Sequence, residues 1–329
     1  MKKTTISDIA QVAGVSKTTV SRYLNHQYER MSIGTQQKIK QTISDLHYSP
    51  NRSAQSLKKN KSLTIGISVA DISNSYTSRL FKGINEVLNS TAYQVIIVDS
   101  DNNSALETSN LTKLVNDGID GLIIQPLTAD SNHYQTLIDM KIPTIQVDRY
   151  IDTQIWPSVV SDNIDKSYQV AQLIQQKSYT HVIVITNCAK SISSRKNRIK
   201  GLKAGLIDSS IKATILDIDQ LADWEATLLD ELHSHQRVAL YALNGHILRE
   251  TIRLLKSQNL AFPTDVGLIG YDDDNFADLI TPSVSAITQN PLGIGQLAAK
   301  QLLDIINAPS SIPPKKIEIP SRMDIRESL

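Results

Sequence analysis

The most restrictive feature of this 329-residue sequence is a regular alternation that begins at Leu63, where short apolar runs are separated by segments long enough for one helix. Runs that are apolar on both faces and alternate with helices are typical of parallel sheets covered on both sides. The pattern therefore predicts an α/β body with parallel strands. The runs are LTIGISVA, YQVIIVDS, DGLIIQP, IPTIQVD, HVIVITN, ATILDI, RVALYAL and VGLIGYD.

Polar side chains follow most of these apolar runs. In open α/β sheets, ligands bind beyond the carboxyl ends of the strands. We therefore expect a cleft for a polar small molecule where these side chains gather. They are Asp71, Asp99, Gln125, Asp148, Asn187, Asn244 and Asp272.

Residues 1–49 have a different pattern, which predicts three short helices. Apolar side chains at helical spacing predict the first helix, Gly14 interrupts it, and Ser16 can cap the second. A third helix is expected at about residues 32–46. The positions expected to pack inward in the first two helices are Ile6, Ile9, Ala10, Val12, Ala13, Val15, Val20, Tyr23 and Leu24.

Two helices joined at a glycine form a helix-turn-helix pattern, and the charge of this region bears on what it binds. Residues 1–62 carry 11 Lys and Arg against 3 Asp and Glu, whereas the rest of the chain carries 23 against 30. A basic head on an acidic body indicates that only the head meets a polyanion.

The second helix would expose Lys17, Thr18, Ser21, Arg22 and Asn25 on one face. Arg pairs bidentately with guanine, Asn pairs with adenine, and hydroxyls bind bases or phosphates. The alternative is a helical hairpin with a merely solvated face. The basic charge of the head favours DNA.

The stretch TTISDIAQVAGVSKTTVSRYLN, followed at a distance by SPNRSAQSL, resembles the head of the LacI/GalR (lac repressor–gal repressor) family of bacterial transcription regulators. The body carries similar landmarks in the same order, among them VDR, SSRKNRIKGL and VGLIGYDD, so the resemblance covers essentially the whole chain. It implies a helix-turn-helix domain at 1–49, a hinge helix and linker at 50–62, and a two-subdomain body like a periplasmic binding protein. The N-subdomain would be 63–161 plus about 290–320, and the C-subdomain 162–289 plus about 321–329.

The resemblance also implies which residues meet DNA. Leu57 would wedge between base pairs in the minor groove, which kinks the duplex, although composition alone would make 51–62 a basic flexible linker. The full DNA-binding set is Thr5, Ser7, Ser16, Lys17, Thr18, Ser21, Arg22, Asn25, Asn51, Ala54, Gln55 and Leu57.

Matching to the family's effector pocket indicates Tyr76, Asp148, Arg198, Asn244, Asp272 and Gln289, whose side chains suit sugar hydroxyls. Arg195 lies one helical turn before Arg198. It could clamp a carboxylate bidentately, or be a solvated residue at the start of a helix. Trp224 and Phe276 could supply a stacking surface or be ordinary packing residues.

These features predict a transcription regulator that represses carbohydrate genes. It would bind a palindromic operator as a homodimer, and a small sugar or sugar acid would switch its DNA affinity. A corepressor-dependent regulator that responds to a purine is the first alternative. A solute-binding protein and an α/β enzyme are more remote, because the sequence has neither a secretion signal nor a catalytic constellation.

We expect no catalytic residue, no cofactor, no metal site and no membrane contact. GIGQLA at 293–298 lacks the strand context of a dinucleotide site, and His233 and His235 have no further ligands nearby in the sequence. The single cysteine, Cys188, fits a reducing cytoplasm, and the tail SRMDIRESL has no heptads, which favours a dimer.

Overall fold

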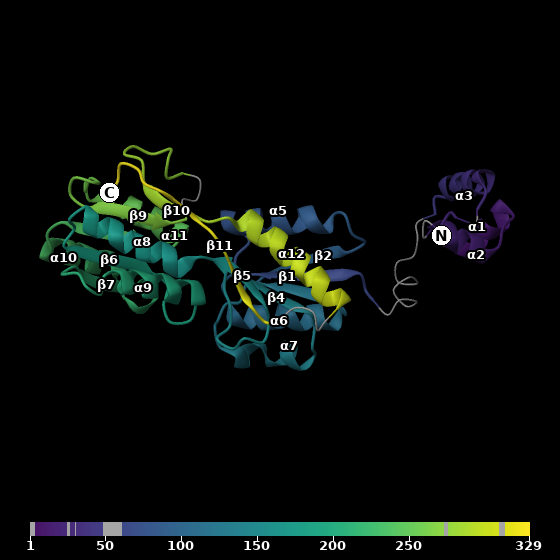
Figure 1. Ribbon diagram of the computed structural model, residues 1–329, viewed down its shortest axis with the longest axis horizontal. Coiled ribbons are helices and arrows are strands. Elements are labelled where there is room, and N and C mark those ends of the chain that lie inside the picture. Colours follow the sequence, from purple (N-terminus) through teal and green to yellow (C-terminus); the bar gives the residue numbers. More distant parts are fainter. Residues whose placement is uncertain (1–3, 25–26, 30, 49–60, 273–275, 309–312) are drawn as a thin grey trace. The chain divides into compact units, whose positions relative to one another are not determined.

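The computed structural model describes residues 4–24, 27–29, 31–48, 61–272, 276–308 and 313–329 (Figure 1). The chain divides into two compact units, residues 1–62 and residues 63–329. We call the first unit the head and the second the body. Within the described ranges, no helix combines the length and the apolar character that a membrane span requires.

The head contains the three predicted helices, α1 (Ile6–Ala13), α2 (Lys17–Leu24) and α3 (Ile33–Asp45). Thr5 begins α1 through a capping box with Asp8, and Gly14 ends it in the left-handed conformation (φ 65°), which glycine adopts without strain. The side chains of Ile9, Val20 and Ile39 are fully buried between the three helices. One inward position was wrong, because Val12 is 60% exposed: the buried face of α1 carries Ile9, Ala10 and Ala13, and Val12 projects from another face.

The first sheet of the body is parallel throughout, in the order β11-β5-β4-β3-β1-β2. Helices cover both faces: α5 and α12 pack with Ile65 and Ile67, and α6 and α7 pack with Leu122 and Ile124. The strands are β1 (Thr64–Val69), β2 (Gln94–Asp99), β3 (Gly121–Ile124), β4 (Thr144–Val147), β5 (Ser158–Ser161) and β11 (Lys316–Ile319). The helices are α5 (Ser75–Leu88), α6 (Ser104–Asn116), η1 (Ser131–Tyr134), α7 (Gln135–Asp139) and α12 (Pro291–Asn307).

The second sheet has the order β12-β10-β9-β8-β6-β7, and only β12 is antiparallel. Ile183 and Ile185 of β6 pack under α10 and α11, whereas Val182 and Val184 pack under α8 and α9. The strands are β6 (His181–Thr186), β7 (Lys212–Asp217), β8 (Val238–Ala242), β9 (Gly267–Tyr271), β10 (Ser285–Thr288) and β12 (Arg322–Asp324). The helices are α8 (Asn163–Gln176), α9 (Ser193–Gly205), η2 (Ile218–Gln220), α10 (Trp224–Ser234) and α11 (Gly245–Ser257).

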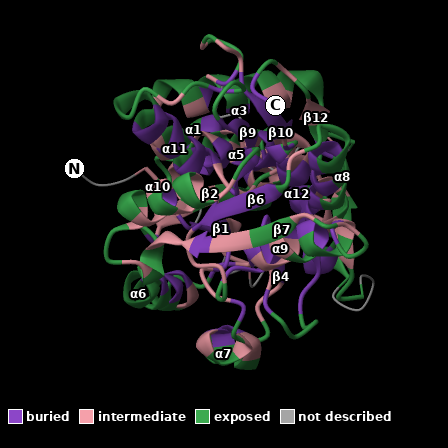
Figure 2. Cartoon of the chain, turned by 90° about the vertical axis from the view of Figure 1, so that its left-hand side faces the viewer, coloured by how far each residue is buried: buried purple, intermediate pink, exposed green. Residues whose placement is uncertain are grey.

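Burial explains why the apolar runs are reliable markers of this fold. Every residue of β6 is buried, whereas its neighbour β7, at the sheet edge, is partly exposed (Figure 2). A central parallel strand has helices on both faces and must be apolar on both. All eight apolar runs form strands, which confirms the predicted α/β body.

The crossing of α8 and α9 is unusually close, because a Cβ on Gly201 would lie 2.1 Å from the carbonyl oxygen of Ile164. We expect Gly201→Ala to lower the free energy of unfolding of the body by about 1–3 kcal/mol, because backbone must shift to admit the methyl group. Urea unfolding checks this. Lys200→Ala, at an exposed position next to it, is the control and should change stability by less than about 0.5 kcal/mol.

Candidate DNA-binding head and effector cleft

The second helix of the head presents a polar face. Lys17, Thr18 and Arg22 are exposed and Ser21 is half-buried, while Val20 on the same helix is fully buried. Ser16 supports the start of α2, since its Oγ accepts a hydrogen bond from the backbone N–H of Thr19 at 3.1 Å. The helix therefore separates a packing side from a side that offers hydrogen-bonding groups to a partner.

The remaining DNA-contact predictions divide into two groups. Thr5 is exposed, but its side chain is engaged in the α1 capping box, and Ser7 is half-buried in the first turn of that helix. The other predicted contacts lie outside the described residues: Asn25, Asn51, Ala54, Gln55 and Leu57.

The body contains a cleft of about 320 Å³ at the carboxyl ends of the strands of both sheets. Tyr76, at the start of α5, lines it from the first sheet, and Asp272 and Gln289, directly after β9 and β10, line it from the second. Arg79, His246 and Arg249 add basic groups to its wall. This position agrees with the rule for open α/β sheets that predicted the cleft.

Gln289 joins the carboxyl ends of the two sheets. Its Nε2 donates hydrogen bonds to both carboxylate oxygens of Asp272, at 2.7 and 2.9 Å. Its Oε1 accepts a hydrogen bond from the hydroxyl of Ser161, at the end of β5. The backbone of Asp272 is left-handed (φ 72°), which orients the carboxylate at the strand end.

Asp148 is held in a matching way in the first sheet. Nε2 of Gln125 donates to Oδ2 of Asp148 at 2.7 Å, and Oε1 of Gln125 accepts from the backbone N–H of Ala70. Nε of Arg149 lies 3.4 Å from the same carboxylate oxygen of Asp148, in an ion pair without hydrogen-bond geometry. Both sheets thus place a buried or half-buried carboxylate at a strand end.

Arg198 is fully buried and firmly positioned. Its Nε donates to Oδ1 of Asn163 at 2.7 Å, its Nη1 donates to the carbonyl of Leu243 at 2.5 Å, and its guanidinium lies 3.5 Å above the centre of the Tyr271 ring. Burial acts to lower the pKa of Arg198, but Tyr271 and Asp272 outweigh it and the pKa is raised. The guanidinium therefore stays charged.

Arg195 lies in the same interior with few partners. Its Nη2 donates to Oδ1 of Asn187 at 3.4 Å, a long contact, and its Nε has no hydrogen-bond partner among the described residues. Burial, followed by the like charges of Arg149 and Arg198, lowers the pKa of Arg195 to about 9. It is thus a buried cation with incomplete compensation. The interpretation of Arg195 as a solvated residue was wrong, because α9 points this side chain inward and leaves it 8% exposed.

Several other buried polar atoms near these charges also lack a hydrogen-bond partner within the described part of the chain. They include the hydroxyls of Tyr76, Ser194 and Tyr271 and Nη1 of Arg149. The Tyr76 hydroxyl interacts electrostatically with Asp148, Asp272 and Arg198, so it lies among them. Because buried polar groups are almost always hydrogen-bonded, this cluster has the character of a binding site for a polar ligand.

The chain has relatives along its whole length. Residues 5–51 match the model for bacterial regulatory proteins of the lacI family, and residues 170–329 match that for periplasmic binding protein-like domains. The HTH-type transcriptional regulator KdgR of Bacillus subtilis (strain 168) is 31% identical over 332 residues, which cover 99% of this chain and 98% of KdgR. The chain belongs to the lacI family.

Solved structures of other regulators share the fold of this lacI-family protein. The lac repressor dimer bound to operator and the anti-inducer ONPF matches with a TM-score of 0.83 at 21% identity, covering 99% of both chains. A complex of the transcriptional regulator CelR with cellobiose matches with a TM-score of 0.71 at 22% identity, covering 99% of this chain and 100% of CelR. The lacI-family head makes this protein a helix-turn-helix transcriptional regulator rather than an enzyme.

The structure separates the predicted effector residues of this lacI-family chain into two groups. Tyr76, Asp272 and Gln289 line the cleft, whereas Asp148, Arg195 and Arg198 belong to the buried cluster of charges that interacts with Tyr76 or within itself. Asn244 is adjacent, because its Nδ2 donates to Asn187 and its Oδ1 caps α11. Trp224 packs on the core of the second sheet and does not line the cleft. Phe276 packs there too, with the guanidinium of Arg249 5.9 Å from its ring centre.

The sequence reasoning missed several residues of this interior. Arg149 was contained in the VDR landmark but was not singled out, and Gln125 was noted only as the end of an apolar run. Asn163 was contained in the family landmark SDN at 161–163 but was not singled out, because its bond to Arg198 depends on the close crossing of α8 and α9.

Proposed function

We propose that this lacI-family protein represses genes of carbohydrate metabolism and that a small sugar acid, bound in the body, switches its affinity for operator DNA. The observation that carries the effector class is the charge of the buried cluster that adjoins the cleft at Tyr76 and Asp272. Three buried guanidinium groups, those of Arg149, Arg195 and Arg198, face two carboxylates, Asp148 and Asp272. A ligand carboxylate would balance the excess positive charge, which a neutral sugar would leave uncompensated.

Different side chains would bind the hydroxyl groups and the carboxylate of such a ligand. Asp148 and Asp272 can accept hydrogen bonds from sugar hydroxyls, and the Tyr76 hydroxyl can donate one. Arg198 is already committed to Asn163 and Leu243, so it can supply a fixed charge. Arg195 and Arg149 retain unpartnered N–H groups that can bind a carboxylate in charge-assisted hydrogen bonds.

Closure of the body around a bound ligand would connect binding in this cleft to the affinity for DNA. Three contacts connect the segment that follows β4 in the first sheet with α9 of the second sheet. The backbone N–H of Tyr150 donates to the hydroxyl of Ser193 at 2.8 Å, and Asn197 donates to the Tyr150 hydroxyl at 2.9 Å. Lys196 forms an ion pair with Asp152. A ligand that changes these contacts would bias the body between two arrangements. Such a bias is a coupling free energy between effector and DNA sites.

On the DNA side, we propose a homodimer that reads a palindromic operator, since one small head covers only one half-site. The exposed face of α2 supports this assignment, with Lys17, Thr18, Ser21 and Arg22 as reading residues supported by Ser16. We keep Thr5 and Ser7 as proposed DNA contacts. Asn25, Asn51, Ala54 and Gln55 are proposed contacts outside the described residues, as is Leu57 as the minor-groove wedge.

A ligand screen on the full chain tests the effector class. Hexuronates and aldonates should raise the melting temperature, and their neutral parent sugars at the same concentration should not. The stabilising acids should then change the affinity for an operator selected in vitro with this protein. A neutral sugar or a purine base that stabilises the protein as strongly as any acid would refute the sugar-acid assignment. An acid that stabilises the body without altering DNA affinity would refute the switch.

A further inference from the structure

Three potential metal ligands meet at the end of the second sheet that is opposite the cleft. His181 is the first residue of β6, Glu231 lies in the last turn of α10, and His235 directly follows that helix. The cleft lies beyond the carboxyl ends of the strands, whereas His181 marks the amino end of its strand. The cluster is therefore a separate feature from the effector site.

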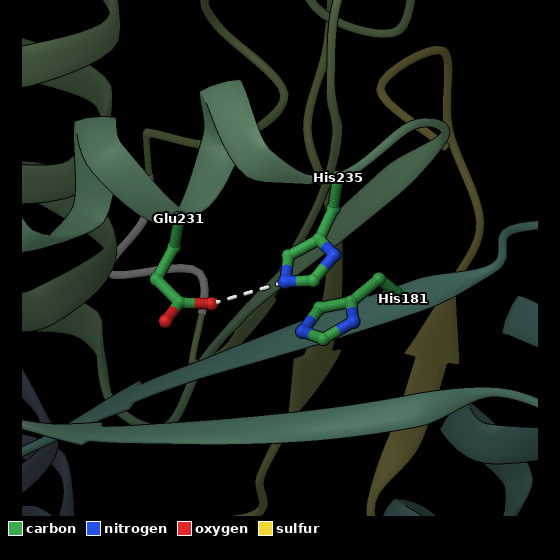
Figure 3. Close-up of side chains that lie close together, drawn as sticks. All are labelled: His181, Glu231 and His235. Carbon is green, nitrogen blue, oxygen red and sulfur yellow. Dashed lines mark ion pairs between the residues drawn. The ribbon is translucent and has the colours of Figure 1, made fainter.

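The donor atoms of the three side chains all lie within 4.8 Å of one another. Nε2 of His235 is 3.4 Å from Oε2 of Glu231. The two imidazole rings are stacked, with centroids 3.8 Å apart and planes inclined by 9°. Figure 3 shows a nitrogen of each ring on the edge that faces the Glu231 carboxylate.

We propose that His181, Glu231 and His235 bind a divalent transition-metal ion of the Zn²⁺ type and thereby tether the end of α10 to β6. Two imidazole nitrogens and one carboxylate oxygen are a donor set that Zn²⁺ takes, with water as the fourth ligand. Ligands 2.0–2.1 Å from a tetrahedral ion are about 3.3 Å apart. The observed separations reach that spacing by side-chain rotation, with the rings tilting so that their lone pairs converge.

The three proposed ligands differ in their exposure. His181, at the buried side of the cluster, is 4% exposed. Glu231 and His235 are about one-third exposed, which leaves an entry path for the ion and room for a water ligand.

Thr214 of β7 holds two of the ligands in place. Its hydroxyl donates to Oε2 of Glu231 at 3.3 Å and lies 2.8 Å from Nε2 of His181, from which it accepts a hydrogen bond. Binding of the ion at Nε2 of His181 would release this proton and end that hydrogen bond, while Thr214 keeps its bond to Glu231. The alternative explanation is that the stacked rings and the carboxylate form only a local polar contact.

Titration of the tag-free full chain with ZnCl₂, after treatment with a chelator, tests the proposal by calorimetry. We expect one ion per chain, and at about 100 times Kd a rise in melting temperature on the order of 5 °C. Co²⁺ should give the visible absorption of a tetrahedral site. His235→Ala should weaken binding by more than the roughly 10–100-fold loss that removal of an outer-shell partner causes.

The matched control is His233→Ala, because His233 lies two residues away on the exposed side of the same helix end. It should bind Zn²⁺ with the affinity of the unaltered protein, and Glu231→Gln should behave like His235→Ala. Absence of one-to-one binding, or equal affinity in His235→Ala and the unaltered chain, would overturn the proposal. So would equal losses in the His233 and His235 variants. In all three cases the stacked histidines are only a local polar contact.

Discussion

Arg195→Gln should raise the dissociation constant for a sugar-acid effector roughly 100- to 4,000-fold. Removing one partner of a buried ion pair costs about 3–5 kcal/mol, and each 1.4 kcal/mol corresponds to a factor of ten. The binding of the neutral parent sugar should change little or improve, because that ligand gains nothing from the charge. The variant should therefore bind the acid and its neutral parent sugar with similar affinity. Calorimetry with the matched acid and neutral ligands measures both affinities.

The variant should not unfold the body. The pKa of Arg195 is lowered to about 9 by burial and by Arg149 and Arg198. A base with a lowered pKa in the folded state binds its proton less tightly there than in the unfolded chain, so its charge destabilises the fold at neutral pH. The destabilisation by the charge of Arg195 is relieved only as pH rises through and above about 9. Removing the charge should leave the melting temperature of the ligand-free protein unchanged or higher.

Lys200→Gln is the matched control, because it removes one positive charge from an exposed position on the same helix, α9. It should bind acids with unchanged affinity. If Arg195→Gln and Lys200→Gln had the same effect, the charge would act at long range and Arg195 would not contact the effector. If Arg195→Gln still preferred acids by the original factor, the assignment of Arg195 to the carboxylate would be wrong.

The sequence predicts well the strands that appear as apolar runs, including the edge strands β2 and β7, and predicts poorly the short strands β5 and β11. Strands such as β6 are buried on both faces and read as continuous apolar runs. β5 (SVVS) and β11 (KIEI) have only four residues each, and β11 pairs with β5 across more than 150 residues. Such short strands are defined by their partners, and local composition does not reveal a distant partner.

The same distinction applies to the sites. Asp148, Asp272 and Gln289 follow strands, and a strand end is visible in the sequence. The partners that hold Arg198 are not, because Asn163 reaches it through the close contact of α8 with α9 at Gly201. The cluster of His181, Glu231 and His235 was not recognised for a similar reason. Glu231 lies four residues before His235, but only the fold brings His181 to them, from 54 residues away from His235.

Replacing Arg22 by Ala should reduce the specific operator affinity of the proposed dimer roughly 30- to 20,000-fold, since a bidentate contact to a base contributes about 1–3 kcal/mol and the dimer would make two such contacts. The side chain is exposed on α2, so its loss leaves the head's core of Ile9, Val20 and Ile39 intact. Binding to random DNA should fall far less, because phosphate contacts dominate that mode. Fluorescence anisotropy with selected operator and random duplexes, at several salt concentrations, measures both.

Arg22→Lys separates base reading from simple charge. Lysine keeps the positive charge but loses the planar fork that binds two acceptors at once. It should retain the salt dependence of the unaltered protein while losing most of the preference for the operator. Lys40→Ala, which removes an exposed charge from α3, should retain that preference. If Arg22→Lys discriminated operator from random DNA as well as the unaltered protein, Arg22 would be a phosphate contact, and the reading residues of α2 would have to be found among Lys17, Thr18 and Ser21.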